Sequence, residues 1–278
     1  MVIFKNADQI AQFLTEEKNK NKTIGFVPTM GALHQGHLSL IEAAKQQNDI
    51  TVCSIFINPA QFNNPEDFER YPVTIEKDIA LLLTAECSIL FLPSINEVYP
   101  PGYEKKEFPL SKIETILEGH YRPGHFQGVC QVMDRLLDII NPDSLFMGQK
   151  DYQQCLVIQQ LIQLKRGHYQ LVVEPTVREG DGLAMSSRNL RLSEEDRLKA
   201  ATLYKALTYI ESNFRQAPLK ILKRTAKQDL EREGFVVDYV EIADARTLDT
   251  TIAHSDKVVA LVAATINNIR LIDNMILN

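Results

Sequence analysis

Short, wholly apolar segments alternate with helix-length segments over the first two-thirds of this chain. Buried-strand patterns cover residues 23–28, 50–57, 87–92, 144–147 and 170–173. Helical patterns cover residues 39–47, 74–84, 129–140 and 151–164. Strands that are apolar throughout and separated by helices indicate a parallel sheet covered on both faces. Such a sheet binds ligands at the carboxyl ends of its strands, near the point where the strand order reverses.

The pattern changes near Glu174 and Pro175. A charged helical stretch is expected over residues 193–213, opened by Ser193 and Asp196 in a capping-box pattern. A second helix is expected at 220–233, and strands at 236–242, 257–264 and 268–272. The fold class is therefore α/β: a Rossmann-like, doubly wound parallel sheet over residues 1–175, then a smaller α+β domain over 176–278.

Charge and cysteine content exclude several classes of protein. The formal charge of −6 over 278 residues argues against a broad grip on nucleic acid, although not against one small anion. Four cysteines stand singly, so the spacing supports neither a zinc site nor a disulfide framework, and we expect buried, reduced thiols. The amino terminus does not read as a secretory signal, and no apolar run is long enough to span a membrane. We expect a cytoplasmic protein.

The first polar constellation follows the strand at 23–28 and covers Met30 to His37. Gly31 and Gly36 allow tight turns and the close approach of a ligand. His34 and His37 would stand at a helix N-terminus, where free amides and the helix dipole favour an anion. The segment is neither a P-loop nor GxGxxG. A phosphate cradle is one interpretation, and a purely structural turn is the other.

Two further constellations have the same character. Residues 146–154 follow another strand; there Lys150 could neutralise phosphate and Asp151 could bind a ribose hydroxyl, or simply cap a helix beside a solvated lysine. Residues 183–189 contain Ser186, Ser187 and Arg188, which could wrap an anion or form an ordinary surface loop. The convergence of such loops at several strand ends favours an enzyme that acts on a nucleotide.

Five motifs together resemble one family. Residues 26–37, 56–62, 121–128, 146–154 and 185–189 closely resemble, in order and spacing, the signatures of the pantoate–β-alanine ligase family. That family is related to the class I aminoacyl-tRNA synthetases, in which His-Ile-Gly-His and Lys-Met-Ser-Lys-Ser loops do the work expected here of His34 to His37 and of Met185 to Arg188.

The resemblance implies an ATP-dependent amide synthesis in two steps. Pantoate attacks the α-phosphate of ATP and gives pantoyl adenylate and pyrophosphate. The amine of β-alanine then attacks the acyl carbon and releases AMP and pantothenate. The resemblance also implies Mg²⁺ and a homodimer. The net charge and the short apolar runs lead us to expect no nucleic-acid and no membrane partner. A glycine-rich hinge beside Ser186 to Arg188 further suggests that the carboxyl-terminal domain closes as a lid.

The resemblance also implies roles for individual residues. The ATP-binding set comprises Met30, Gly31, Ala32, Leu33, His34, Gln35, Gly36, His37, Gly148, Gln149, Lys150, Asp151, Val177 (through its backbone, toward adenine), Met185, Ser186, Ser187 and Arg188. The catalytic set within it comprises His37, His34, Lys150, Ser186, Ser187 and Arg188. The family assigns His37 as a proton donor. Since adenylation has no leaving oxygen that requires a proton, we expect His37 to stabilise charge instead. The set for pantoate and β-alanine comprises Gln61, Gln154 and Asn58.

Asp78 aligns with an acidic position that has been proposed to help hold Mg²⁺. Its neighbours here are Glu76 and Lys77, where some family members carry further acids, so we expect phosphates and water to hold most of the metal. An exposed helix carboxylate is the alternative for Asp78. Arg122 and His125 fit the family pattern and receive only a supporting role.

Three rival functions differ from this one in features that can be checked. A nucleotidyltransferase that transfers AMP to a phosphate would lack the pocket of Asn58, Gln61 and Gln154. A fragment of a class I aminoacyl-tRNA synthetase would carry basic, anticodon-binding regions. A regulatory protein that binds a nucleotide without turnover would produce no AMP.

Overall fold

The computed structural model describes residues 1–62, 65–253 and 255–277. The chain divides into two compact units. The amino-terminal unit comprises residues 1–148 and 153–175, and the carboxyl-terminal unit comprises 149–152 and 176–278. The predicted division after residue 175 differs from these units in the segment 149–152, which groups with the carboxyl-terminal unit.

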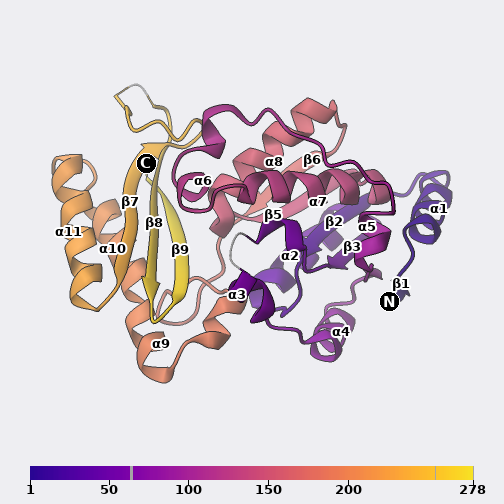
Figure 1. The fold of residues 1–278 in the computed structure, drawn as a ribbon, viewed down its shortest axis with the longest axis horizontal. Coiled ribbons are helices and arrows are strands. Elements are labelled where there is room, and N and C mark those ends of the chain that lie inside the picture. The colour runs from indigo at the N-terminus through magenta and orange to yellow at the C-terminus, as the bar shows by residue number, and fades with distance from the viewer. Residues whose placement is uncertain (63–64, 254, 278) are drawn as a thin grey trace. The chain divides into compact units, whose positions relative to one another are not determined.

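A six-stranded parallel sheet forms the centre of the amino-terminal unit (Figure 1). Its strand order is β1-β4-β3-β2-β5-β6. The strands are β1 (Val2–Phe4), β2 (Ile24–Thr29), β3 (Ile50–Ile55), β4 (Ile89–Phe91), β5 (Ser144–Gly148) and β6 (Gln170–Glu174). The predicted Rossmann-like sheet is confirmed. The order reverses between β2 and β5, so the loops that follow these two strands flank the switch point.

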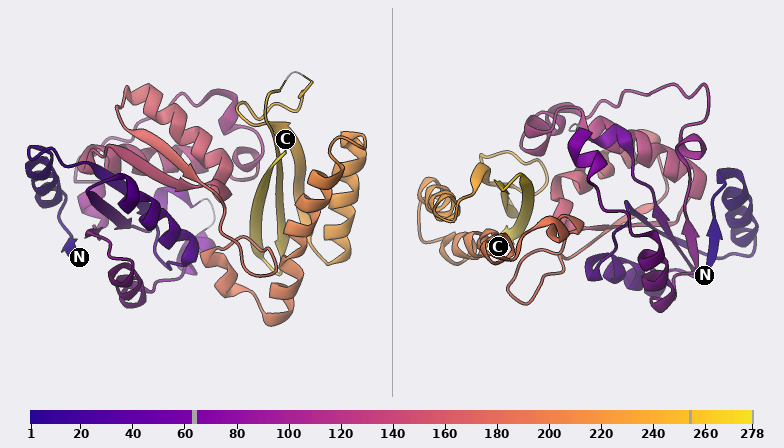
Figure 2. Two further views of the ribbon diagram at one scale, coloured as in Figure 1. Left: turned by 180° about the vertical axis from the view of Figure 1, so that it is seen from behind. Right: turned by 60° about the horizontal axis from the view of Figure 1, so that its bottom comes forward.

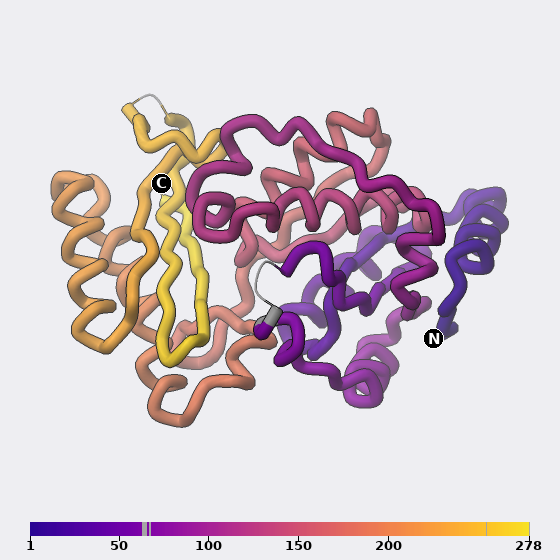
Figure 3. Tube along the Cα trace, viewed as in Figure 1, coloured from indigo at the N-terminus to yellow at the C-terminus, as the bar shows by residue number. Residues whose placement is uncertain are grey.

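Helices cover both faces of this sheet. Buried side chains of α1 (Ala7–Lys18), α7 (His125–Ile140) and α8 (Tyr152–Lys165) pack on one face. Those of α2 (Gln35–Gln47) and α4 (Ile75–Thr84) pack on the other. Alternate residues of β2 belong to the two cores: Phe26 lies in the first and Val27 in the second. Figure 3 traces the chain through these layers. The shorter elements are η1 (Pro59–Gln61), α3 (Pro65–Glu69), α5 (Ile95–Val98), η2 (Ser111–Glu114) and α6 (Glu118–Tyr121).

The carboxyl-terminal unit is built on an antiparallel sheet in the order β7-β8-β9. Its strands are β7 (Val236–Asp244), β8 (Val258–Ile266) and β9 (Ile269–Leu277). Helices α10 (Thr202–Asn213) and α11 (Leu219–Arg232) pack beside these strands in both views of Figure 2. The unit also holds η3 (Gln149–Asp151), η4 (Ser187–Arg191) and α9 (Glu194–Ala200). The predicted α+β class of this region is confirmed.

One expectation about a helix needs correction. The single charged helix expected over 193–213 is two helices, because the amide of Ala201 bonds to the carbonyl of Lys199 and so breaks the regular ladder. Its start is as predicted, since the Ser193 hydroxyl accepts from the amide of Asp196. Strand β1 and helix α1 were not expected from the pattern. All four cysteines are buried, as expected, and within the described residues none of them forms a disulfide. Within the described residues, no helix has both the length and the apolarity that crossing a bilayer requires.

Candidate functional site

The loop after β2 has an unusual backbone. Gly31 has φ +84° and Ala32 has φ +49°, so two consecutive residues adopt the left-handed region. The chain turns sharply there before α2 begins. The Thr29 hydroxyl stabilises the turn, because it accepts from the amide of Gly31 at 3.2 Å and donates to the Ser54 carbonyl at 2.7 Å.

Asp78 holds this loop from α4. Its Oδ2 accepts from the amide of Ala32 at 2.9 Å, and its Oδ1 accepts from that of Leu33 at 2.8 Å. The hydroxyl of Thr74 donates to Oδ1 at 3.0 Å. The side chain is 0% exposed, so the alternative of an exposed helix carboxylate is wrong. Both oxygens are committed to protein donors, which defines Asp78 as the anchor of a strained loop.

His34 and His37 form the N-terminal cap of α2. Nδ1 of His34 accepts from the amide of Gly36 at 3.2 Å, and Nδ1 of His37 accepts from the amide of His34 at 3.3 Å. The ring centroids are 4.1 Å apart. Because a neutral imidazole that accepts at Nδ1 carries its hydrogen on Nε2, both rings are set as Nε2–H donors. The turn therefore has a structural role, and the same bonds fix the tautomer of both rings.

The segment after β3 is held from several sides. Asn58 is 1% exposed, and its amide donates to the carbonyl of Gly128 at 3.0 Å and to Oε1 of Gln61 at 3.4 Å. Its Oδ1 accepts from the Tyr99 hydroxyl at 2.9 Å. Nε2 of Gln61 contacts Sδ of Met30, so the predicted substrate residue touches the first residue of the predicted phosphate loop. The structure thus brings these two motifs together.

Helix α7 packs against the same segment. Nδ1 of His125 lies 2.8 Å from the carbonyl oxygen of Gln61, so the ring donates at Nδ1. Three residues further on, the backbone of Gly128 approaches that of Ala60 and Gln61 so closely that a Cβ at Gly128 would lie 2.7 Å from Cα of Gln61. A methyl group therefore has no room at this position.

Gly128→Ala should displace η1 and with it Gln61. We expect the KM for pantoate to rise at least tenfold, with a loss of about 1–3 kcal/mol in the free energy of unfolding from overpacking. Steady-state kinetics and urea titration measure both effects. Gly180→Ala is the matched control, since an added Cβ there meets no atom within 4 Å. An unchanged KM for pantoate in Gly128→Ala would separate this contact from substrate binding.

The loop after β5 leads into α8, where two adjacent glutamines differ. Gln153 is 2% exposed; its amide donates to the carbonyls of Ile113 at 2.7 Å and Ile116 at 2.9 Å, and its Oε1 accepts from the amide of Glu118 at 3.0 Å. This side chain is committed to structure. Gln154, the predicted substrate residue, is half-buried.

The carboxyl-terminal unit contains the remaining predicted residues except Gly148, which ends β5 in the amino-terminal unit. Gln149 and Lys150 have their carbonyls bound by the side chain of Asn274, at 2.9 Å each. The Val177 carbonyl accepts from the amide of Met185 at 3.0 Å, which closes the base of the loop. The Ser186 hydroxyl caps η4 by accepting from the amide of Arg188, and Ser187 is 6% exposed.

Arg178 ties that loop to β9. Its guanidinium bonds to both carboxylate oxygens of Asp273, at 2.6 and 3.1 Å, and also to the carbonyls of Gly182 and Asn274. It lies 4.5 Å from the ring centroid of Tyr204. Arg178, Asp273 and Asn274 were not among the residues predicted from the sequence. The signal for the last two was a polar pair that interrupts an apolar strand.

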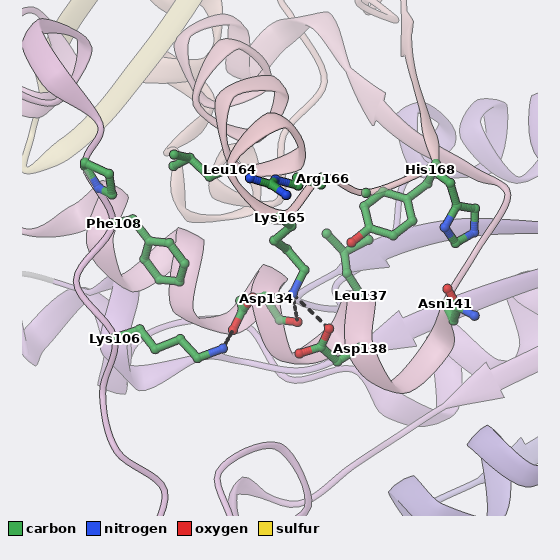
Figure 4. A pocket seen from close by; sticks show the side chains of 13 residues that line it. Lys106, Phe108, Asp134, Leu137, Asp138, Asn141, Leu164, Lys165, Arg166 and His168 are labelled. Atoms are coloured by element: carbon green, nitrogen blue, oxygen red, sulfur yellow. Dashed lines mark hydrogen bonds and ion pairs between the residues drawn. The ribbon is translucent and has the colours of Figure 1, made fainter.

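A cavity of about 590 Å³ lies elsewhere, at the C-terminal ends of α7 and α8 (Figure 4). Buried Asp134 binds Lys106 at 2.6 Å and also Lys165 in it. Burial raises the pKa of the Asp134 carboxyl, but hydrogen bonds from Lys106 and Lys165 outweigh that effect, so the pKa lies below its ordinary value. None of the predicted site residues lines this cavity.

Asp134→Asn tests this cluster through the pH dependence of stability. A carboxyl whose pKa is lowered by folding stabilises above its unfolded pKa of about 4, and the contribution is lost as the pH falls through the folded value. At pH 7 the variant should lose about 3 kcal/mol of unfolding free energy, and the deficit should shrink below pH 4. Urea titrations at pH 7 and pH 3 measure it; an equal deficit at both values would contradict the assignment.

These features define a Rossmann-like enzyme whose polar loops follow the strands at a switch point, with a paired-histidine helix cap. A model of the family described as pantoate-beta-alanine ligase matches residues 2–276. The pantothenate synthetase of Cytophaga hutchinsonii is 43% identical over 282 residues, covering 100% of this chain and 99% of that protein. That of Thermotoga petrophila is also 43% identical, with 100% of both chains covered.

Solved structures agree. The pantothenate synthetase of Thermus thermophilus superimposes with a TM-score of 0.91 at 38% identity, covering 99% of both chains. The pantoate-beta-alanine ligase of Francisella tularensis, complexed with beta-gamma ATP and beta-alanine, gives 0.84 at 37% identity, covering 99% of this chain and 97% of that one. This chain belongs to the pantoate–β-alanine ligase family. It is a ligase that joins pantoate to β-alanine and forms pantothenate.

Proposed function

We propose that the chain forms pantothenate through a pantoyl-adenylate intermediate, with ATP bound at the loop after β2. The observation that carries this proposal is the pair of imidazoles at the N-terminus of α2, both set as Nε2–H donors. The helix dipole and two directional donors favour a polyphosphate there. The carboxylate of pantoate attacks the α-phosphate, and pyrophosphate leaves. The amine of β-alanine then displaces AMP from the acyl carbon.

The histidines act on charge in this scheme. Negative charge gathers on phosphate oxygens in the first transition state, and catalysis is mainly positioning and electrostatic stabilisation. A neutral Nε2–H donor supplies such stabilisation without giving up its proton. We therefore assign charge stabilisation to His37, with His34 beside it.

Gln61 is proposed to bind pantoate and to lie near the second substrate. Its contact with Met30 supports this, because a carboxylate bound there starts close to the phosphate loop. The side-chain amide of Asn58 donates to Gly128 and Gln61, so its proposed role is to hold Gln61 in place. Gln154 is proposed as the second amide for pantoate.

The carboxyl-terminal unit is proposed to supply phosphate and nucleoside contacts. Lys150, Ser187 and Arg188 offer charge-assisted or hydroxyl donors to phosphate. Asp151 is exposed at the end of η3 and is proposed to bind the ribose. The amide of Val177 is proposed to face adenine, since its carbonyl is already bound to Met185.

Mg²⁺ is proposed to enter as the complex with ATP. No cluster of three His, Cys, Asp or Glu side chains that could hold a metal occurs in the part of the chain that the structure describes. Asp78, the predicted ligand, is buried with both oxygens on backbone amides. These residues do not fit a metal site made by protein side chains.

Oxygen labelling tests the acyl-adenylate proposal. Pantoate with ¹⁸O in its carboxylate should transfer one labelled oxygen to AMP and keep the other in the amide of pantothenate. Mass spectrometry of AMP measures the transfer. Unlabelled AMP, or ADP as the nucleotide product, would overturn the proposed route while leaving the ligase activity itself intact.

Three further proposals concern assembly, location and closure. Light scattering should give a mass twice 31.6 kDa for a homodimer. Fractionated cells should hold the protein in the cytoplasm.

If the carboxyl-terminal unit excludes water from the adenylate, Ser186→Ala and Arg188→Ala should release AMP in excess of pantothenate.

A further inference from the structure

Lys150 lies on a short segment that is hydrogen-bonded to Asn274 of strand β9. The amide of Asn274 donates to the carbonyls of Gln149 and Lys150 at 2.9 Å each, and its Oδ1 accepts from Nε2 of Gln149 at 3.0 Å. Asn274 is 2% exposed, so these bonds form away from water. Two of these bonds hold the backbone on which Lys150 stands, and the third holds the side chain of Gln149.

Asp273, the residue before Asn274, acts through Arg178 on the loop that leads to Ser186. Asp273 is 3% exposed and binds the guanidinium of Arg178 through both oxygens. Arg178 in turn bonds to the carbonyl of Gly182, inside the loop that leads to Ser186. The backbone amide of Asn274 also donates to Oδ1 of Asp273 at 2.8 Å, which links the two residues.

Burial of the Asp273 carboxyl outweighs the effect of the Arg178 guanidinium and raises the pKa of that carboxyl above its ordinary value. Two adjacent residues of one strand thus connect the lysine segment and the Ser186 segment.

We propose that Asn274 is a positioning residue that places Lys150 for the phosphates of ATP, with Asp273 and Arg178 performing the same task for the Ser186 to Arg188 segment. This inference rests on the proposed function of Lys150. In this role Asn274 touches no substrate, and its side chain acts through the backbone of residues 149 and 150.

A double-mutant cycle on ATP affinity tests the proposal. Lys150→Ala should weaken ATP binding by about 100-fold through the loss of a charge-assisted contact. Asn274→Ala should weaken it by about 10- to 30-fold through two lost hydrogen bonds. If Asn274 acts through Lys150, the double variant should bind ATP within about threefold of Lys150→Ala alone.

Calorimetric titration of the full chain with ATP separates this role from a structural one. A merely structural role would lower the number of binding sites and leave Kd unchanged in the folded fraction. Asn274→Ser, which keeps a donor for one carbonyl, should give an intermediate Kd and serves if the alanine variant fails to fold. Asn267→Ala is the control, since that amide binds Asp196 at 2.8 and 2.9 Å, and its Kd should stay within about twofold of wild type.

The Kd values distinguish the positioning role of Asn274 from ATP binding by Lys150. If the fold-increases in the Kd for ATP of Lys150→Ala and Asn274→Ala multiply in the double variant, the positioning role alone is overturned. An unchanged Kd in Asn274→Ala would have the same consequence. An unchanged Kd in Lys150→Ala would overturn both the positioning role and the ATP-binding role of Lys150.

Discussion

His37→Ala should slow the formation of pantoyl adenylate by about 10²–10³-fold, the effect of one lost transition-state donor. The reason is geometric. Nδ1 of His37 accepts from the amide of His34, so in the proposed scheme Nε2–H is the group that stabilises phosphate charge. Single-turnover formation of AMP from ATP and pantoate measures the step.

Two further variants of His37 separate its functions. Asparagine keeps an acceptor near Nδ1 and loses the Nε2–H donor, so His37→Asn should be nearly as slow as alanine. Glutamine keeps a donor near Nε2 and should recover part of the rate. If His37→Gln is as slow as alanine, a proton transfer, rather than charge stabilisation, is the better account. His168→Ala, at an exposed position, should match wild type.

Asp78→Ala should have the largest effect on stability. It leaves the amides of Ala32 and Leu33 buried without their acceptor, at a cost of about 2–5 kcal/mol in unfolding free energy. It also releases a loop with two left-handed residues, so ATP affinity should fall at least tenfold. Urea titration and ATP titration measure the two effects. Thr74→Val removes one donor to Asp78 and should produce a smaller loss of the same kind.

The dependence on Mg²⁺ distinguishes an anchor from a metal ligand. With ATP saturating, the Mg²⁺ concentration for half-maximal rate should be unchanged in Asp78→Asn. A rise of tenfold or more would show that Asp78 binds the metal and would contradict the anchoring role. Glu76→Gln, in the same helix and exposed, is the matched control and should leave both stability and metal dependence unchanged.

Much of the fold follows from local patterns. Strands β2, β3 and β4 are buried at nearly every position, as expected of the inner strands of a parallel sheet, and their apolar runs predict them. Strand β1 was missed because it is three residues long and lies at the sheet edge, where Val2 is 50% exposed. An edge strand of this length carries no pattern that separates it from a loop.

The candidate site residues were predicted from contiguous motifs, whereas the partners that hold them, which are distant in sequence, were not predicted. Asn274 binds the carbonyl of Lys150 across 124 positions, and Asp78 binds Ala32 across 46. A buried carboxylate on backbone amides and a metal ligand look alike in sequence, because both are an aspartate in the first turn of a helix. The close approach of Gly128 to Ala60 likewise depends on how α7 packs.

The most direct test of the central claim is pantoate-dependent exchange of labelled pyrophosphate into ATP in the absence of β-alanine. The account predicts exchange, since a reversible adenylate forms before the amine arrives, and predicts none without pantoate. Absence of exchange, with AMP and pantothenate formed only once β-alanine is present, would contradict a free adenylate step and favour a concerted reaction or trapped pyrophosphate.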